Sequence, residues 1–304
     1  MNTDPLVCGQ GTEPQQYEQR ELMTSGHLAC PGCGAAMAMR LALKAMGPDT
    51  VVVIPASCWA IIPGPFPYSN LKTPLMHTAF ETTGAAISGV RAALDLQGKE
   101  STQVMGWAGD GGTFDIGLQS LSAAAERNEN VLYVCYDNEA YMNTGIQRSG
   151  ATPQYAWTTT TPTDHPKDEA KKNIDRIMAA HCIPYVATTT SGHPHDLMAK
   201  FAKARDIRGF RFIHVLCSCT AGWKIDSALS VEVMRLAVDC GLFPLYEVED
   251  GIHYTINVQP KGASLKDYLM RQGRFRHMSD EHVASLQRQI EREWTWLEKQ
   301  TRDS

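Results

Sequence analysis

The chain has 304 residues, of which 43% are hydrophobic and 20% are charged, and its formal net charge at pH 7 is −5. These values are ordinary for a globular protein with a packed core, and the acidic balance argues against nucleic acid as a partner. The longest apolar runs are strand-sized, far short of the roughly 20 residues that a membrane helix needs. The first residues lack the pattern of a secretory signal, so we expect a cytoplasmic protein with no membrane partner.

Helical and strand-like patterns alternate along most of the chain. In chain order, the sequence predicts a helix at 35–45, a strand at 51–54, a helix at 85–94, a strand at 103–107, a helix at 118–125, a strand at 130–136, a helix at 170–180, a strand at 184–187, a helix at 196–205, a strand at 210–215 and a helix at 227–239. This alternation predicts an α/β fold, a mainly parallel sheet with helices on both faces. In such sheets, ligands bind beyond the carboxyl ends of the strands.

Other stretches fall outside this alternation. Residues 63–74 contain four prolines and predict an ordered surface loop, and residues 146–166 predict a long Thr-rich loop, a kind that is usually functional or disordered. After residue 242 the sequence predicts a hairpin-like region and then a charged helix at 280–299. We therefore divide the chain into an irregular N-terminal arm (1–24), a main α/β domain (25–242) and a C-terminal extension (243–304).

The nine cysteines do not suggest a disulfide framework, because their number is odd and the expected compartment is reducing. One group is expected to be small core residues or to lie in the arm: Cys135, Cys182, Cys240 and Cys8. The informative group is Cys30 and Cys33, together with the distant Cys58 and Cys219. Two residues separate Cys30 from Cys33, and the glycines that follow each allow the tight turn that lets both thiolates bind one metal centre.

Three interpretations of these cysteines stay open. A zinc site would favour a second close pair, whereas Cys217 and Cys219 are separated by one residue and Cys58 stands alone. A thioredoxin-like dithiol would be expected in a smaller domain. An iron–sulfur cubane accepts scattered ligands, because its corners are farther apart than the ligands of tetrahedral zinc. The residues alone leave a cluster, a zinc ion and no metal as alternatives.

A second motif predicts a clamp for a metal-bound diphosphate. Gly109-Asp110-Gly111 ends a predicted strand, where backbone N–H groups can approach a diphosphate while the carboxylate holds a divalent cation. Asn138 follows the next predicted strand, which brings the two loops to the same sheet edge. Gly-Asp-Gly also occurs in simple turns, so two unrelated turns remain the alternative.

The motifs together resemble a known family. They are Gly-His-Leu-Ala-Cys-Pro-Gly-Cys-Gly (26–34), Gly-Asp-Gly-Gly-Thr-Phe-Asp-Ile-Gly (109–117), Asp-Asn-Glu-Ala-Tyr-Met-Asn-Thr-Gly (137–145), Gly-Ala-Thr-Pro (150–153) and Gln-Gly-Arg-Phe-Arg-His (272–277). They resemble the thiamine diphosphate-binding β subunits of 2-oxoacid:ferredoxin oxidoreductases, most closely the pyruvate synthase (pyruvate:ferredoxin oxidoreductase) group. The likeness covers about residues 24–278. It implies a thiamine diphosphate-binding fold, with thiamine diphosphate, Mg²⁺ and a [4Fe-4S] cluster as cofactors.

The resemblance also implies roles for individual residues. The cluster ligands would be Cys30, Cys33, Cys58 and one of Cys217 or Cys219, and we choose Cys219 because it begins a Cys-x-x-Gly-Trp segment. The magnesium ligands would be Asp110, the side chain of Asn138 and the backbone carbonyl of Ala140. The remaining residues expected at the cofactor are Gly109, Gly111, Asn143, Thr144 and His27. Asn143 is the catalytic candidate, since it matches a residue near the reactive carbon and the substrate.

The implied reaction is the reversible, coenzyme A-dependent oxidative decarboxylation of pyruvate, with electrons passing through the cluster to ferredoxin. The implied partners are an α subunit that binds the pyrimidine and supplies the activating glutamate, and ferredoxin-like γ and δ subunits with further [4Fe-4S] clusters. The alternatives are another 2-oxoacid (branched-chain, aryl glyoxylate or oxalate), a non-redox thiamine decarboxylase, and a zinc-stabilised scaffold subunit. Residues 59–74 and 250–260 depart from the family pattern, which leaves the substrate open.

Three further side chains have two readings each. His27 is expected near the diphosphate or substrate, or in a structural hydrogen bond. Glu81 is expected at an interface or a helix cap rather than at the cofactor. Arg148 is a candidate for contact with a carboxylate or for exposure to solvent.

Overall fold

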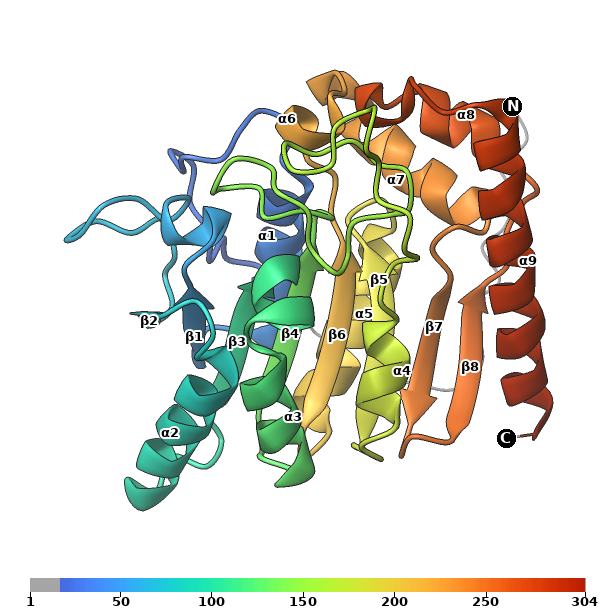
Figure 1. Ribbon diagram of the computed structural model, residues 1–304. Helices are drawn as coiled ribbons and strands as arrows, with labels where there is room; N and C mark the ends of the chain where they lie inside the picture. Colours follow the sequence, from blue (N-terminus) through green and yellow to red (C-terminus); the bar gives the residue numbers. More distant parts are fainter. Residues whose placement is uncertain (1–16, 304) are drawn as a thin grey trace, which may run out of the picture.

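Eight strands form one sheet at the centre of the computed structural model, which describes residues 17–303 (Figure 1). Their order across the sheet is β2-β1-β3-β4-β6-β5-β7-β8. The strands are β1 (Thr50–Pro55), β2 (Leu75–Thr78), β3 (Gln103–Gly109), β4 (Leu132–Asp137), β5 (Tyr185–Thr190), β6 (Arg211–Leu216), β7 (Leu245–Glu249) and β8 (His253–Val258). β1 to β6 pair in parallel, and β7 and β8 add an antiparallel hairpin beside β5. The predicted α/β fold with a mainly parallel sheet is confirmed.

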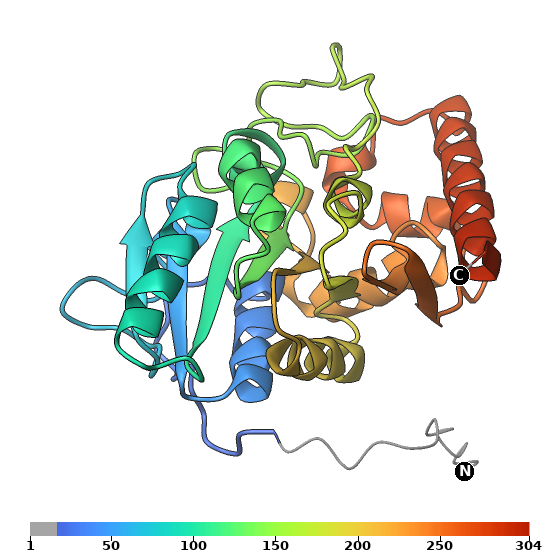
Figure 2. The same ribbon diagram turned by 90° about the horizontal axis from the view of Figure 1, so that it is seen from below.

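Helices cover both faces of the sheet (Figure 2). α1 (Gly34–Met46) and α5 (Pro194–Asp206) pack together on one face, while α2 (Thr83–Leu96), α3 (Leu118–Glu126) and α4 (Ile174–Ala179) lie on the other. α6 (Thr220–Trp223) follows β6. α7 (Ser230–Asp239), α8 (Leu265–Met270) and α9 (Asp280–Asp303) gather near the hairpin.

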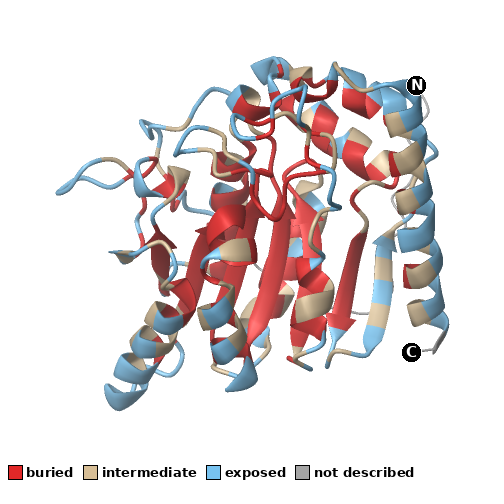
Figure 3. Cartoon of the chain, viewed as in Figure 1, coloured by how far each residue is buried: buried red, intermediate tan, exposed pale blue. Residues whose placement is uncertain are grey.

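The covered strands have no polar face. Every residue of β4, β5 and β6 is buried (Figure 3), as expected for parallel strands with helices on both sides. β8 instead alternates exposed and half-buried residues, the pattern of an edge strand. The polar residues at the carboxyl ends of the buried strands therefore stand out against an apolar interior.

Some predictions were wrong or shifted. β2 was not predicted, because it is a four-residue edge strand that follows a proline-rich loop. The helix predicted at 170–180 begins only at Ile174, since Asn173 caps it by accepting a hydrogen bond from Arg176 N at 2.9 Å. Cys135 and Cys240 are buried as expected, but Cys182 is exposed at a turn with φ of 53°.

The predictions for the two ends of the chain can be compared with the structure in part. Residues 1–16, including Cys8, lie outside the described residues, and residues 17–33 form no helix. The predicted hairpin is present as β7 and β8, in the same sheet as the other strands, and the predicted C-terminal helix is α9. The boundaries at 24 and 242 stay predictions. None of the helices within residues 17–303 has the length and apolarity needed to cross a membrane.

Candidate functional site

Four neighbouring strands end in the loops that carry the predicted site residues. β1, β3, β4 and β6 are adjacent in the sheet, and Cys58, Asp110, Asn138 and Cys219 follow them by three residues or fewer. Carboxyl ends of adjacent parallel strands meet at one sheet edge, so the fold brings the two predicted sites together.

Oxygen atoms converge where β3 and β4 end. Asp110 is buried and leads into a π-helical turn, Gly111–Asp115, and its Oδ2 accepts a hydrogen bond from Ser149 Oγ at 2.5 Å. Its Oδ1 and the carbonyl oxygen of Ala140 both face the side-chain oxygen of Asn138. Turning the Asn138 amide over would place its nitrogen 3.0 Å from each of these two acceptors. In the orientation that the structure gives, the oxygens of Asp110, Asn138 and Ala140 face one another, and none of these three groups donates a hydrogen bond to another.

This set of oxygens suits a small divalent cation. Neighbouring ligands in an octahedral magnesium shell, with bonds of about 2.0–2.1 Å, lie about 3 Å apart. Burial and the nearby Asp137 carboxylate raise the pKa of Asp110 well above its usual range. A cation among these oxygens would offset that repulsion. The donor atoms and their spacing therefore fit Mg²⁺.

A cavity of about 110 Å³ opens beside these oxygens. Its walls include the glycines after β3 and the aromatic rings of Phe80, Tyr136 and Tyr141, and Cys58 reaches the same cavity. Asn143 and Thr144 line it from an exposed loop. The cavity is smaller than the roughly 300–1,000 Å³ of a complete small-molecule site.

Other candidate side chains lie outside this cavity. His27 is exposed, and its Nδ1 accepts from the backbone N–H of Ala29 at 3.4 Å. Glu81 is exposed as well, while its backbone carbonyl accepts from Ser120 Oγ at 2.7 Å. Arg148 reaches Glu169 at 3.4 Å. None of the three lines the cavity, so their roles at the cofactor stay predictions.

We expect Gly111→Ala to weaken binding of thiamine diphosphate. A Cβ at this position would lie 2.4 Å from Cε1 of Tyr141, so the ring that lines the cavity must move. The expected loss is roughly tenfold in affinity, the scale of an overpacked core site. Titration calorimetry with the assembled enzyme measures it. Gly89→Ala is the matched control, because no atom lies within 4 Å of its added Cβ; equal affinity for both variants would contradict the prediction.

The cysteines form the second half of the site. Cys33 and Cys219 stand at the starts of α1 and α6, and Cys58 begins a 3₁₀ turn, Cys58–Ala60. Cys219 Sγ accepts from Gly222 N at 3.4 Å. Burial above all, and then the charges of Cys219, Cys33, Asp110 and Cys30, together raise the pKa of Cys58 to about 12. The four thiols thus lie close enough to repel one another as thiolates.

The structure separates Cys219 from Cys217. Cys217 is buried in the apolar core, and its thiol donates to the carbonyl of Val215 at 3.4 Å. Cys219 is only partly buried, and its charge, unlike that of Cys217, is among those that raise the pKa of Cys58. The choice of Cys219 over Cys217 as a cluster ligand stays a prediction. Within residues 17–303, no three His, Cys, Asp or Glu side chains are grouped to hold a single metal ion.

Comparisons with known proteins identify the family to which this chain belongs. Residues 63–215 match the family model described as thiamine pyrophosphate enzyme, C-terminal TPP binding domain. Ketoisovalerate oxidoreductase subunit VorB of Pyrococcus furiosus is 48% identical over 287 residues, which cover 90% of this chain and 92% of that protein. Pyruvate synthase subunit PorB of Methanothermobacter marburgensis is 47% identical over 279 residues, which cover 90% and 96%. The chain belongs to the β subunits of the 2-oxoacid:ferredoxin oxidoreductases.

A solved structure supports the fold of this β subunit. A 2-oxoglutarate:ferredoxin oxidoreductase from Magnetococcus marinus matches with a TM-score of 0.56 and 22% identity, covering 74% of this chain and 80% of that one. At this identity the match shows the architecture alone. The relatives named as subunits VorB and PorB, rather than this match, indicate that the β subunit is part of a multi-subunit oxidoreductase that acts on an oxo group.

In the β subunit, buried ion pairs hold the loop that carries Asn138. Asp137 and Glu139, on either side of it, both bind Lys171 Nζ, which lies 2.9 Å from Glu139 Oε1. Arg274 Nη2 lies 2.5 Å from the other Glu139 oxygen. Burial opposes the charge on Asp137, but Lys171 and other partners outweigh it and lower its pKa to about 2. These contacts fix the backbone from which Asn138 and Ala140 project.

α6 links the cysteines to the oxygen site. Cys219 caps its first turn, and Trp223 at its end donates from Nε1 to the carbonyl of Asn138 at 2.8 Å. The guanidinium of Arg274 lies 4.0 Å from the Trp223 ring centre. One short helix therefore fixes a cysteine and the Asn138 loop relative to each other.

The sequence did not reveal these supporting residues. Glu139 and Arg274 are 135 positions apart and show no periodic signal. Both lie in motifs that carry the family resemblance, at 137–145 and 272–277. The only sequence signal for a supporting role was that these two charged residues belong to motifs shared with the family.

His214 gives the β subunit a pH-dependent stability. Burial opposes its charge, but Asp175 and Asp137 outweigh that effect and raise its pKa to about 9, with nitrogen–oxygen distances of 3.0 and 2.9 Å. A raised pKa stabilises the fold fully below about pH 6.5, and that stabilisation is lost as pH rises through 9. We expect the urea midpoint to fall across this range by more in the wild type than in His214→Gln. Parallel curves would contradict this.

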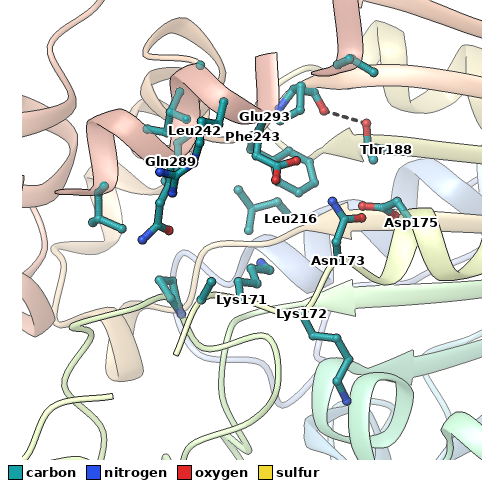
Figure 4. Close-up of a pocket in the computed structure, with 18 of the residues that line it drawn as sticks. Lys171, Lys172, Asn173, Asp175, Thr188, Leu216, Leu242, Phe243, Gln289 and Glu293 are labelled. Carbon is teal, nitrogen blue, oxygen red and sulfur yellow. Dashed lines mark hydrogen bonds between the residues drawn. The ribbon is translucent and has the colours of Figure 1, made fainter. Parts of the chain in front are cut away.

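A larger cavity of about 340 Å³ lies on the other side of Glu139, between the sheet and α9 (Figure 4). Leu216 of β6, Asp175 of α4 and Lys171 from the loop before α4 line one side of it, and Gln289 and Glu293 of α9 line the other. Its buried charges are paired with one another in the network described above. This cavity therefore adjoins the support of the oxygen site rather than the site itself.

Proposed function

We propose that this β subunit binds Mg²⁺ and the diphosphate of thiamine diphosphate through Asp110, Asn138 and Ala140, and holds a [4Fe-4S] cluster on Cys30, Cys33, Cys58 and Cys219. The observation that carries the proposal is that Cys58 lines the same cavity as Asp110 and Asn138. Iron–sulfur clusters are held by four thiolates.

The proposed reaction is the reversible oxidative decarboxylation of a 2-oxoacid, with coenzyme A as acyl acceptor and ferredoxin as electron acceptor. When bound, thiamine diphosphate supplies the chemistry that releases carbon dioxide, and the cluster takes up single electrons. The protein's part is to fix both groups within a short distance. Gly109 and Gly111 admit the diphosphate closely, and Asn143 and Thr144 orient the substrate from the exposed side.

We propose pyruvate as the substrate and 2-ketoisovalerate as the second candidate. The relatives named pyruvate synthase subunit PorB and ketoisovalerate oxidoreductase subunit VorB reach 47% and 48% identity, so similarity favours neither. Phe80 and Met142 give the cavity an apolar wall that suits a small aliphatic side chain. An α subunit would close the cavity and bring the pyrimidine-binding residues, and γ and δ subunits would carry further clusters.

The test is an anaerobic assay of the assembled complex. Pyruvate, 2-ketoisovalerate, an aryl glyoxylate and oxalate are compared, with and without coenzyme A, by following ferredoxin reduction. We expect pyruvate to give the highest kcat/KM and to require coenzyme A. A higher value for 2-ketoisovalerate would favour the second candidate. Carbon dioxide release without ferredoxin reduction, or full turnover by this chain alone, would contradict the proposal.

A further inference from the structure

Met142 lies between the small cavity and one of the proposed cluster ligands. Its side chain is half-buried and lines the cavity next to Asn143. On its other side it rests against Gly222 of α6, because a Cβ added to that glycine would overlap Met142 Sδ. The same Cβ would lie 3.6 Å from Cys219 Sγ. Both sulfur atoms therefore border one glycine, the thioether from the cavity side and the thiol from within α6.

The seat of Met142 on α6 is fixed by the structure. Cys219 caps the start of this helix, and the backbone N–H of Gly222 donates to its Sγ at 3.4 Å. Trp223, at the other end, donates from Nε1 to a backbone carbonyl of the loop after β4 at 2.8 Å. Both the helix and the loop that carries Met142 are thus held relative to each other. The missing side chain at Gly222 leaves the space that the thioether fills.

The wall that Met142 and Gly222 form is apolar. Met142 and Cys219 pack against the same hydrophobic cluster, which includes the buried Trp223 and Ile225. Methionine is unbranched and flexible, which suits it to fill an irregular gap of this kind. Cys58, in contrast, lines the cavity directly. Met142 therefore separates one corner of the cysteine cage from the cavity and leaves another corner in contact with it.

Water near an iron–sulfur cluster changes its reduction potential. Reduction adds a negative charge, which water stabilises, so an apolar shell that excludes water lowers the potential. We propose that Met142 shields the Cys219 corner of the cluster from water and thereby keeps its reduction potential low. The inference rests on the proposed function, in which this cluster passes electrons to ferredoxin. A low potential makes that transfer more favourable.

The test is a redox titration of the assembled complex, purified without oxygen and without substrate, and followed by electron paramagnetic resonance. Met142→Ala opens the wall, and Met142→Leu keeps an apolar side chain of similar size. Met142→Gln keeps the length but brings a polar amide beside Cys219, so it tests the shield without leaving a void. Met270→Ala is the matched control, since Met270 is 37% exposed at the end of α8 and outside the cavity. The clusters proposed for the other subunits serve as internal references.

A double variant tests where the shield acts. In G222A/M142A, the new methyl group enters the space that the thioether leaves, 3.6 Å from Cys219 Sγ. It should therefore exclude water from the same corner, and we expect it to reverse most of the shift seen in Met142→Ala. A loss of packing alone predicts no such reversal of the potential.

We expect Met142→Ala and Met142→Gln to raise the ratio of reduced to oxidised cluster roughly tenfold at a fixed potential, a shift of about 59 mV for one electron. Met142→Leu and Met270→Ala should keep the wild-type potential. The inference would be overturned by an unchanged potential in Met142→Gln with its iron intact, by an equal shift in Met142→Leu, or by no reversal in the double variant. Failure of the proposed function is a different result, a wild-type complex without iron.

Discussion

Asp110→Asn is expected to abolish binding of thiamine diphosphate while the fold stays intact. The substitution keeps the shape of the side chain but removes the only carboxylate among the three converging oxygens, so the charge that would hold Mg²⁺ is lost. The expected loss of affinity is roughly 100-fold or more, above the range seen when groups that only support a metal ligand are changed. Titration calorimetry at saturating Mg²⁺ measures it, and turnover should fall with it.

The stability of this variant separates a binding role from a structural one. Asp110 is buried beside the Asp137 carboxylate, so an uncharged amide relieves repulsion rather than breaking an ion pair. We expect the melting temperature of the cofactor-free chain to be unchanged or higher. Asp164→Asn, at a 75% exposed side chain, is the control. Normal cofactor affinity in Asp110→Asn, or a collapse of its fold, would contradict the assignment.

Cys219→Ala is expected to lose most of its iron, whereas Cys217→Ala keeps it. The two thiols are separated by one residue, yet Cys219 influences the pKa of Cys58, whereas Cys217 is buried and donates to the carbonyl of Val215. Iron and sulfide analysis of the anaerobically purified proteins measures the difference, supported by visible absorption that bleaches on reduction. Cys217→Ala should lower only stability, by about 1 kcal/mol for the small void it leaves.

The same pair of variants tests the remaining interpretations of the cysteines. Iron loss in Cys217→Ala with iron retained in Cys219→Ala would reverse the assignment. Zinc in place of iron in the wild type would favour the scaffold alternative. Thiamine diphosphate binding should survive in Cys219→Ala, because the oxygen set has no cysteine among its atoms.

Much of the fold could be predicted because its signals are local. The buried strands are continuous apolar runs, and the helices between them carry apolar faces, so alternation alone indicated the sheet. β2 escaped prediction because an edge strand of four residues has too few buried positions to form a pattern. The helix start at Ile174 was readable in principle from Asn173, a common helix cap, but the charged Lys171 and Lys172 also suit a helix.

The sequence allowed prediction of the candidate ligands of the site but not of the residues that support them. Glycine, aspartate and cysteine residues at strand ends predict metal and phosphate binding, and the order of the strands places them at one edge of the sheet. The groups that hold them in place come from distant segments: Lys171, Arg274 and Trp223 contact residues 137–139 across 32 or more positions. Such pairs depend on how loops cross in space, which local sequence does not encode.

At the end of β4 and in the loop after it, successive side chains point alternately to two different parts of the structure. Asp137 and Glu139 enter the ion-pair network, while Asn138 and Ala140 face the small cavity. Inserting or deleting one residue here would exchange the two sets, turning acids toward the small cavity and an amide toward Lys171. The number of residues between Asp137 and Ala140 is therefore constrained as strongly as their identity. Attempts to alter substrate preference by grafting should begin at Met142, or else transfer Lys171 and Arg274 together with the graft.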